Sequence, residues 1–293
     1  MAWLQLHIPT TAEHAEAVED AMQELGASAV SLVDGADQPL FEPPPGATPL
    51  WQETIVSALF PADADAQALI AALRQQLDPP PADYRFEQLA DQAWERAWMD
   101  EFNPMRFGER LWIVPSWADA PDPQAINLRL DPGLAFGTGT HETTALCLAW
   151  LDGADLGGTT VLDFGCGSGV LAIAALLLGA ERAVAVDIDP QALLATRSNA
   201  ELNGVSGRLE CYLPQEMPGG DYDVVLANIL AGPLVTLAPQ LIGHCRPGGR
   251  IALSGILREQ AENVMAAYRA EVTLAPLAVR GDWTRVDGIR KST

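Results

Sequence analysis

Two periods of hydrophobic and polar positions alternate along the first part of the chain. The stretch WLQLHIP (3–9) alternates apolar and polar side chains, as expected of a half-buried strand. Within 11–25, apolar residues recur every three or four positions, which predicts an amphipathic helix. Its apolar stripe is Ala15, Val18, Met22 and Leu25. This part of the chain therefore opens with a strand followed by a helix.

The same periods continue through the rest of this segment. Further strands are predicted at 28–35 and 51–60, separated by the proline-rich loop FEPPPGATP. A helix is predicted at 63–77, with acidic residues in its first turn, and PPPADYRFEQL ends in a last strand. The apolar stripe of that helix is Leu69, Ile70, Leu73 and Leu77. The order β-α-β-β-α-β predicts a ferredoxin-like α+β domain over residues 1–90.

The second part of the chain has a different pattern, in which continuous apolar strands alternate with helices from Val161 onward. Strands such as TVLDFG, AVAVDIDP and DYDVVLANIL indicate burial on both faces of a sheet. We therefore predict a doubly wound parallel sheet in a Rossmann-like α/β domain over residues 105–293. Between the two domains we predict a linker helix at 91–104, where Trp94 and Trp98 are packing anchors one turn apart.

The charge of the chain limits its partners. The formal net charge is −22, and residues 1–104 hold 18 acidic residues against three arginines. Such a surface repels bare nucleic acid, whose binding depends on basic contacts to phosphate, so we expect no direct nucleic-acid binding. It would steer a basic partner toward the protein, although solubility alone is an alternative reason for the charge.

Further features of the composition indicate the cellular compartment. The longest apolar run, from Val170 to Ala180, is too short to cross a bilayer, and no secretory signal is predicted. The four cysteines are scattered and no histidine cluster accompanies them, so neither a disulfide framework nor a metal site is expected. We therefore expect a cytoplasmic protein without a membrane segment.

The stretch DFGCGSG (163–169) predicts a strand that ends in a glycine-rich turn and leads into a helix. A dinucleotide-binding turn has the pattern G-x-G-x-x-G, and the pyrophosphate rests on the helix that follows. Here the pattern is G-x-G-x-G, preceded by Asp163, and a carboxylate there favours a cationic ligand without phosphate. S-adenosyl-L-methionine, with its sulfonium and ammonium groups, is such a ligand. A nicotinamide cofactor stays open at this point.

Two polar residues end the next strands of the predicted sheet. Asp187 lies 22 residues after Gly165, close to the spacing at which a carboxylate accepts the ribose hydroxyls of a nucleoside cofactor. Asp189 competes for that role, but Pro190 beside it favours a helix cap. Asn228 follows a buried strand, where it either caps the next helix or offers acceptors to an incoming amine.

A second glycine-rich stretch, LDPGLAFGTGTHETT, lies upstream of the sheet and leads into a helix. The dense run Phe136-Gly-Thr-Gly-Thr140 favours a lid over a bound cofactor rather than an ordinary connection. Within the stretch, His141 is assigned to loop packing, with a proton relay as the alternative.

Four motifs together resemble the ribosomal protein L11 methyltransferases, the PrmA family. They are DPGLAFGTGTHETT, DFGCGSGVLAIAA, DIDPQA and NILAGPL, and NPMRFGERLWIVPSW is similar to the family as well. The resemblance covers nearly all of residues 90–293. It implies a class I S-adenosylmethionine-dependent methyltransferase domain whose cofactor-binding residues are Thr144, Gly165, Asp187 and Asn228. One departure is Glu142, where relatives often carry proline; it leaves the two threonines that follow in place.

The resemblance also implies a function. It indicates a cytoplasmic enzyme that methylates the N-terminal α-amine and lysine ε-amines of the basic ribosomal protein L11. The ferredoxin-like domain would recognise this substrate, and the linker helix would let that domain reposition over the active site. The motifs supply no general base, so no catalytic residue is assigned, and we expect a monomer.

Three alternatives belong to other classes of protein. A nicotinamide-dependent oxidoreductase is disfavoured by the G-x-G-x-G turn and by Asp163. A methyltransferase of nucleic-acid bases is disfavoured by the acidic surface and by NIL in place of an aromatic-bearing N-P-P-Y motif. A ribosome-assembly factor with a vestigial pocket is disfavoured because Gly165, Asp187 and Asn228 are all intact.

Overall fold

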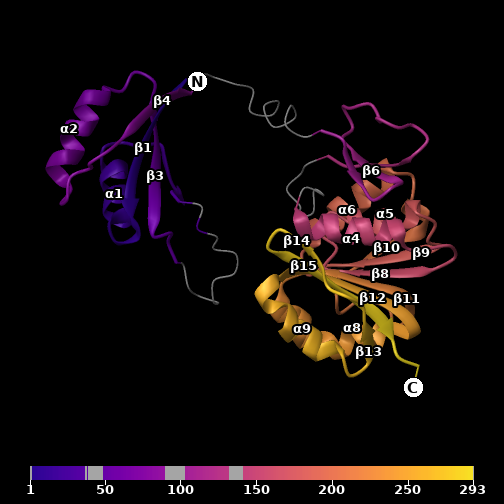
Figure 1. The fold of residues 1–293 in the computed structure, drawn as a ribbon. Coiled ribbons are helices and arrows are strands. Elements are labelled where there is room, and N and C mark those ends of the chain that lie inside the picture. The colour runs from indigo at the N-terminus through magenta and orange to yellow at the C-terminus, as the bar shows by residue number, and fades with distance from the viewer. Residues whose placement is uncertain (1, 37, 39–48, 90–102, 132–140, 293) are drawn as a thin grey trace. The chain divides into compact units, whose positions relative to one another are not determined.

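The computed structural model describes residues 2–36, 38, 49–89, 103–131 and 141–292 (Figure 1). The chain divides into two compact units, Met1–Met99 and Asp100–Thr293. Most of the linker helix predicted at 91–104, with Trp94 and Trp98, lies outside the described residues. The domain boundaries predicted at 90 and 104 therefore stay predictions.

The N-terminal unit has the predicted order of elements. They are β1 (Trp3–Thr11), α1 (Ala12–Glu24), β2 (Ala29–Asp34), β3 (Glu53–Pro61), α2 (Ala66–Gln76) and β4 (Arg85–Leu89). The four strands form one sheet in the order β2-β3-β1-β4, and all its pairs are antiparallel. This is the ferredoxin-like arrangement, so the predicted fold of this unit is confirmed.

The alternation of β1 explains how this sheet holds its helices. Leu4, Leu6 and Ile8 are buried and belong to the same core as residues of α1 and α2, while the side chains between them are only partly buried. Of the predicted stripe of α2, Ile70 and Leu73 are fully buried, and the two remaining leucines pack against the core from its rim. Burying such apolar side chains is the main contribution to the stability of the unit.

The second unit starts with a small sheet and continues with a large one. The small sheet holds β5 (Met105–Phe107), β6 (Leu111–Val114) and β7 (Ile126–Arg129). The helix α4 (Glu142–Gly153) follows. The large sheet has the order β10-β9-β8-β11-β12-β15-β13, with β14 paired to β15. Its strands are β8 (Thr160–Phe164), β9 (Arg182–Val186), β10 (Leu209–Tyr212), β11 (Tyr222–Asn228), β12 (Cys245–Leu257), β13 (Val272–Leu274), β14 (Ala278–Arg280) and β15 (Trp283–Arg290).

Helices cover both faces of the large sheet (Figure 1). One apolar core joins the sheet to α4, α5 (Val170–Leu177) and α6 (Pro190–Leu202). A second core joins the other face to α7 (Ala231–Thr236), α8 (Ala238–His244) and α9 (Ala261–Tyr268). The sequence of α5 is apolar on all sides, and every residue from Val170 to Leu176 is buried. A doubly wound, Rossmann-like fold is therefore confirmed.

The large sheet is mixed rather than wholly parallel. The pairs among β8, β9, β10, β11 and β12 are parallel, as predicted. The strand β15 pairs antiparallel with β12, β13 and β14. For the β14–β15 pair the reason is the connection, a turn of two residues at Gly281, since so short a turn can join only antiparallel neighbours. The parallel sheet of the prediction holds for five strands and not for the C-terminal ones.

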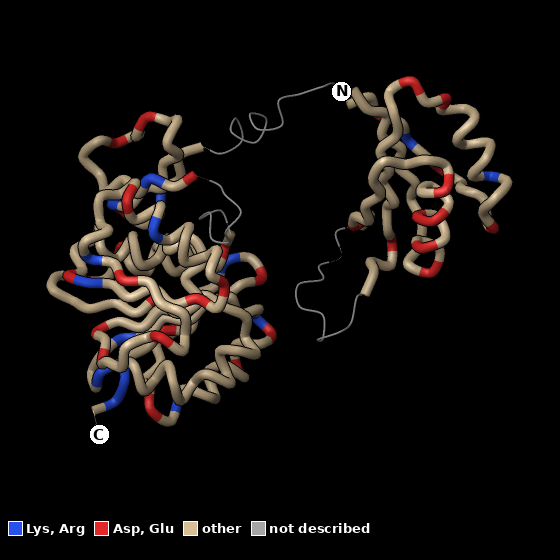
Figure 2. Tube along the Cα trace, turned by 180° about the vertical axis from the view of Figure 1, so that it is seen from behind, with Lys and Arg blue, Asp and Glu red and all other residues tan. Residues whose placement is uncertain are grey.

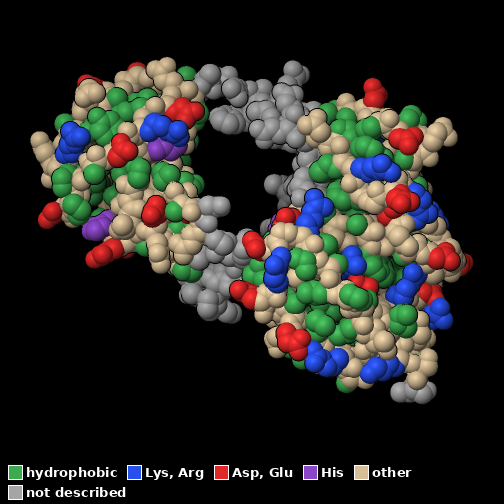
Figure 3. All heavy atoms as spheres, in the orientation of Figure 1, with side chains coloured by type: hydrophobic (Ala, Val, Ile, Leu, Met, Phe, Trp, Pro, Cys, Tyr) green, Lys and Arg blue, Asp and Glu red, His purple; other side chains and the backbone are tan. Residues whose placement is uncertain are grey.

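Charges are distributed unevenly between the two units. Figure 2 shows mainly Asp and Glu on the N-terminal unit, where α1 carries five acidic residues and no Lys or Arg. On the second unit, basic and acidic side chains are interspersed over the side drawn in Figure 3. Within the described parts of the chain, no helix has the length and apolar character needed to cross a membrane.

Candidate active site

The glycine turn follows β8 at the carboxyl edge of the sheet. Gly165, Gly167 and Gly169 have φ angles of 79°, 54° and 76°, a left-handed region that side chains other than glycine rarely enter. The N–H groups of Gly165 and Cys166 both donate to the carbonyl oxygen of Val186, at 2.7 and 3.0 Å. The turn is thus bent tightly against the end of β9.

Most amides of this turn are already used inside the protein. The N–H of Gly169 donates to the carbonyl of Cys166 at 2.8 Å, and that of Gly167 donates to Asp187 Oδ2 at 2.9 Å. A turn that binds a pyrophosphate needs several N–H groups aimed at the ligand. The geometry therefore favours a ligand without phosphate, in agreement with the expectation from the G-x-G-x-G spacing.

Asp187 lies directly after β9 and is half-buried beside the turn. Its Oδ2 accepts from Gly167, and its Oδ1 accepts from the N–H of Asp189 at 3.0 Å. Each carboxylate oxygen keeps lone pairs that a diol can donate to. Asp189 is the N-cap of α6 and accepts from Gln191 N–H at 2.9 Å, so its predicted capping role is confirmed.

Asn228 and Thr144 come together although 84 residues separate them. Asn228 ends β11, and its Nδ2 donates to the hydroxyl Oγ1 of Thr144 at 3.2 Å. Thr144 lies in the first turn of α4 and is 2% exposed. The N-cap of α7 is Leu230, so Asn228 does not cap that helix, and the capping alternative is wrong.

Asp163 is buried in β8 beneath the turn. Its Oδ2 accepts from the N–H of Ala172 at 3.1 Å, whereas its Oδ1 has no hydrogen-bond partner in the described structure. Burial raises the pKa of this carboxyl to about 7; the bond from Ala172 lowers it and the charge of Asp187 raises it. A buried carboxyl oxygen without a partner, next to a binding turn, is suited to a cation bound above it.

The N-terminus of α4 is held from the side by the C-terminal strands. His141 is the N-cap: its Nδ1 accepts from the N–H of Thr143, and its ring lies edge-on to Trp283 with centroids 4.9 Å apart. These contacts support the packing role predicted for His141. The carboxylate of Glu142 lies against the turn at Gly281, where an added Cβ would be 2.5 Å from Oε2. The predicted lid residues 136–140 lie outside the described residues.

Two apolar residues at this edge were missed in the sequence. Ile188 follows Asp187 and is 83% exposed, and Leu230 lies two residues after Asn228 and is 53% exposed. Large apolar side chains left this open beside polar site residues often contact a ligand. The sequence did contain a signal for them, because each follows within two residues a polar residue that ends a strand or comes directly after one.

The sequence is similar to known proteins along nearly its whole length. The family described as "Ribosomal protein L11 methyltransferase (PrmA)" matches residues 2–291. The chain is 60% identical over 293 residues to a ribosomal protein L11 methyltransferase of Pseudomonas aeruginosa (strain LESB58), with 100% of both chains covered. The chain belongs to the ribosomal protein L11 methyltransferase (PrmA) family.

Two further relatives agree with this family. The chain is 60% identical over 292 residues to the ribosomal protein L11 methyltransferase of Azotobacter vinelandii (strain DJ / ATCC BAA-1303), covering 99% of this chain and 100% of the relative. The crystal structure of a ribosomal protein L11 methylase from Lactobacillus delbrueckii subsp. bulgaricus matches with a TM-score of 0.59 and 33% identity, covering 65% of this chain and 99% of that one. The chain is accordingly an S-adenosyl-L-methionine-dependent protein methyltransferase.

The residues at the carboxyl edge fit this cofactor. The turn has few free amides for a phosphate, and S-adenosyl-L-methionine has none. Asp187 offers carboxylate oxygens suited to a ribose diol. The orphaned Oδ1 of Asp163 supplies negative charge beneath the position where a cation would lie. A nicotinamide cofactor, with its pyrophosphate, suits the same residues less well.

Proposed function

We propose that this enzyme methylates the N-terminal α-amine and lysine ε-amines of ribosomal protein L11. The family relatives bear the name of that substrate. The observation that carries the proposal for the reaction is the Asn228–Thr144 contact at the end of β11. Because Thr144 occupies the amide nitrogen of Asn228, the carbonyl oxygen of the same side chain is available to accept from an incoming amine.

Five residues would hold the cofactor. Asp187 would accept the ribose hydroxyls, since both its oxygens keep free lone pairs. Gly165 would bring the backbone of the turn to the methionine end, because its left-handed φ of 79° bends the chain at the end of β8. Thr144 and Asn228 would line the methyl end from the opposite side. Ile188 would pack its exposed side chain against the adenine ring.

Positioning is the main task of the protein in this reaction. When bound, S-adenosyl-L-methionine supplies an electrophilic methyl group. Asn228 would orient the amine by accepting one of its N–H groups, which leaves the nitrogen lone pair directed at the methyl carbon. The amine would lose its surplus proton to water, and transfer of the methyl group to its nitrogen would leave S-adenosyl-L-homocysteine.

The two kinds of amine make different demands on the site. At pH 7, removing the proton costs about 4.6 kcal/mol for a lysine with a pKa of about 10.4, and only about 1 kcal/mol for an α-amine near 7.8. A carboxylate beside the amine would raise both costs, because it stabilises ammonium. Neutral groups such as Asn228 and Thr144, with the apolar Leu230, therefore suit this substrate better than an acid would.

The N-terminal unit would recognise the substrate protein. Its helix α1 has five acidic residues and no Lys or Arg, which suits a basic ribosomal protein and not RNA. The residues 91–104 would connect the recognition domain (1–90) to the catalytic domain (105–293) and let it reposition. We propose that the enzyme works as a monomer in the cytoplasm, where ribosomal proteins are made.

The test uses purified enzyme, labelled S-adenosyl-L-methionine and ribosomal protein L11. Peptide mass spectrometry should locate methyl groups on the N-terminal α-amine and on lysines. L11 with an acetylated N-terminus is the matched control and should lose the first site alone. The catalytic efficiency kcat/KM should fall as ionic strength rises past about 0.15 M, where screening acts within ~8 Å. Label found on ribosomal RNA and absent from L11 would overturn the proposal.

A further inference from the structure

Ile229, the residue after Asn228, lies in close contact with glycines of two neighbouring strand ends. A Cβ added at Gly165 would lie 2.2 Å from Ile229 Cγ2. A Cβ added at Gly255 in β12 would lie 2.3 Å from the carbonyl oxygen of Ile229 and 2.8 Å from its carbonyl carbon. Ile229 therefore has its side chain against the glycine turn and its backbone against β12.

The β12 side of this contact is held firmly. The pairing of β12 with β15 shifts register between Leu253 and Ile256, which marks a bulge at Gly255. Ser254 Oγ donates to the carbonyl of Thr284 at 3.0 Å, and Thr284 Oγ1 donates to the carbonyl of Ile256 at 3.1 Å. These groups are completely buried, so the bulge has no room to move away from Ile229.

The two contacts of Ile229 connect the end of β11, where Asn228 would orient the amine, to the glycine turn. Asn228 is the register partner of Ser254, the residue before Gly255. Asn228 and Ile229 are adjacent in the chain. A shift of the Ile229 backbone therefore moves Asn228 relative to Gly165. Branching at Cβ restricts the χ1 angle of Ile229, which makes its contact with Gly165 stiff.

We propose that Ile229 and Gly255 are positioning residues for methyl transfer. They fix the distance between Asn228 and the glycine turn, so that amine and methyl group meet in one geometry. The inference rests on the proposed role of Asn228. A misplacement of about 1 Å at a reacting group can lower the rate by up to about 100-fold; we expect about 10-fold here, the loss that removing the Asn228 side chain should itself cause.

The first test compares Gly255→Ala with Gly248→Ala, which lies in the same strand. Both glycines have positive φ, 84° and 75°, but a Cβ at Gly248 meets nothing within 4 Å. Both variants therefore carry the same backbone strain, and only Gly255→Ala displaces Ile229. We expect kcat to fall about 10-fold in Gly255→Ala and less than about 3-fold in Gly248→Ala. Cofactor affinity, measured by calorimetry, should fall far less than kcat.

A second test does not depend on whether Gly255→Ala folds. Alone, Ile229→Ala should lower kcat because it frees the end of β11. In a Gly165→Ala background the same change should raise kcat, since it removes the Cγ2 atom that the new Cβ would strike. Circular dichroism and the melting temperature establish that each variant is folded.

The outcomes separate this inference from the proposed function. Opposite effects of Ile229→Ala in the two backgrounds support the inference. A folded Gly255→Ala enzyme with the kcat of Gly248→Ala, or an Ile229→Ala effect that is equal in both backgrounds, overturns it. If Asn228→Ala leaves kcat unchanged, the role of Asn228 is wrong. If kcat still falls in Gly255→Ala, the displaced Ile229 acts on the glycine turn through its contact with Gly165 and not through Asn228.

Discussion

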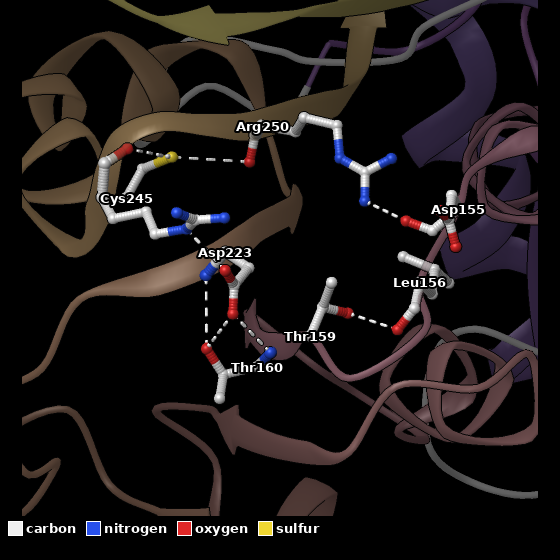
Figure 4. Close-up of polar contacts among 8 residues, drawn as sticks. Asp155, Leu156, Thr159, Thr160, Asp223, Cys245 and Arg250 are labelled. Atoms are coloured by element: carbon white, nitrogen blue, oxygen red, sulfur yellow. Dashed lines mark hydrogen bonds and ion pairs between the residues drawn. The ribbon is translucent and has the colours of Figure 1, made fainter. Parts of the chain in front are cut away.

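The two edges of the large sheet each hold a buried or half-buried aspartate, and the two residues have opposite surroundings. At the amino edge, Asp223 Oδ2 accepts from the N–H and the hydroxyl of Thr160 at 2.7 and 2.8 Å, and Oδ1 pairs with Arg246 Nε at 2.5 Å (Figure 4). At the carboxyl edge, Asp163 has one hydrogen bond, from Ala172, and its other oxygen has no partner among the residues that the structure describes.

These surroundings move the two pKa values in opposite directions. Burial would raise the pKa of Asp223, but the hydrogen bonds from Thr160 and the charge of Arg246 hold it below its ordinary value. Burial raises the pKa of Asp163 to about 7, with little to oppose it. The first carboxylate stabilises the fold, whereas the second destabilises the free protein and is suited to a cationic ligand.

The amino edge is closed by further contacts of the same kind. Arg250 Nη2 donates to the carbonyl of Asp155 at 2.5 Å, and Thr159 Oγ1 donates to the carbonyl of Leu156 at 2.8 Å (Figure 4). At the carboxyl edge, Asp187 and Asn228 also have hydrogen bonds, to Gly167 and Thr144, but the apolar side chains of Ile188 and Leu230 are exposed there. Within one sheet, both carboxylate oxygens of Asp223 have partners at the amino edge, which stabilises the fold. At the carboxyl edge, where the candidate site lies, Asp163 Oδ1 has none among the described residues.

The largest expected effect is on stability in Asp163→Asn. Because the pKa of about 7 in the folded protein lies above the ordinary aspartate value of 3.8, folding takes up a proton between these values, and wild-type stability falls as pH rises from 4 to 7. Asparagine has no such loss. Denaturant unfolding should show little difference at pH 4 and a variant more stable by up to about 4 kcal/mol at pH 8.

The same variant sharpens the comparison through binding. A cation above Asp163 favours its ionised form, so cofactor binding near pH 7 should release a proton and tighten as pH rises. Calorimetry in buffers of different ionisation enthalpy measures this release, which should vanish in Asp163→Asn. Proton release that persists in Asp163→Asn would assign the titrating group elsewhere.

The next effect is expected from Asp223→Ala at the closed edge. The free energy of unfolding should fall by about 2–3 kcal/mol at pH 7, because Thr160 and Arg246 lose a charged partner that is partly screened by solvent. The loss should begin to shrink as pH falls below the ordinary carboxyl pKa of 3.8, and it should disappear once pH has fallen through the lowered pKa of Asp223 in the folded protein, where the wild-type carboxylate takes up its proton. Unfolding curves at both pH values check this, and cofactor affinity should not change.

Asp187→Ala should have a binding effect instead. We expect cofactor affinity to fall by about 1.5–3 kcal/mol, because two ribose hydroxyls lose a charged acceptor. Calorimetry measures the affinity, and Asp223→Ala is the matched control. Wild-type affinity in a folded Asp187→Ala protein would remove this residue from the site.

The smallest effect is expected from Asn228→Ala. Turnover at saturating cofactor should fall by about 10-fold, roughly 1.4 kcal/mol, while cofactor affinity changes less. Steady-state kinetics with L11, together with calorimetry, separate the two quantities. If affinity collapses and turnover is preserved, Asn228 belongs with the cofactor-binding residues only.

Local patterns in the sequence were sufficient for the element order of the N-terminal unit and for the alternation of strands and helices from β8 to β12. The alternation in WLQLHIP and the stripe through Val18 and Met22 are set by neighbours a few residues apart, and β1 and α1 follow them. The glycine turn and Asp187 were also local signals, since backbone conformation and the spacing within one β-α-β unit determine them.

The relationships between distant residues were decided only by the tertiary structure. The contact between Asn228 and Thr144 joins residues that are 84 positions apart. Ile229 lies against Gly165, which follows β8, and against Gly255 in β12. The antiparallel β15 and the orphaned oxygen of Asp163 were likewise not predicted. A sequence shows which side chains are polar, but whether each finds a partner depends on which segments pack around it, and that is settled when the whole sheet assembles.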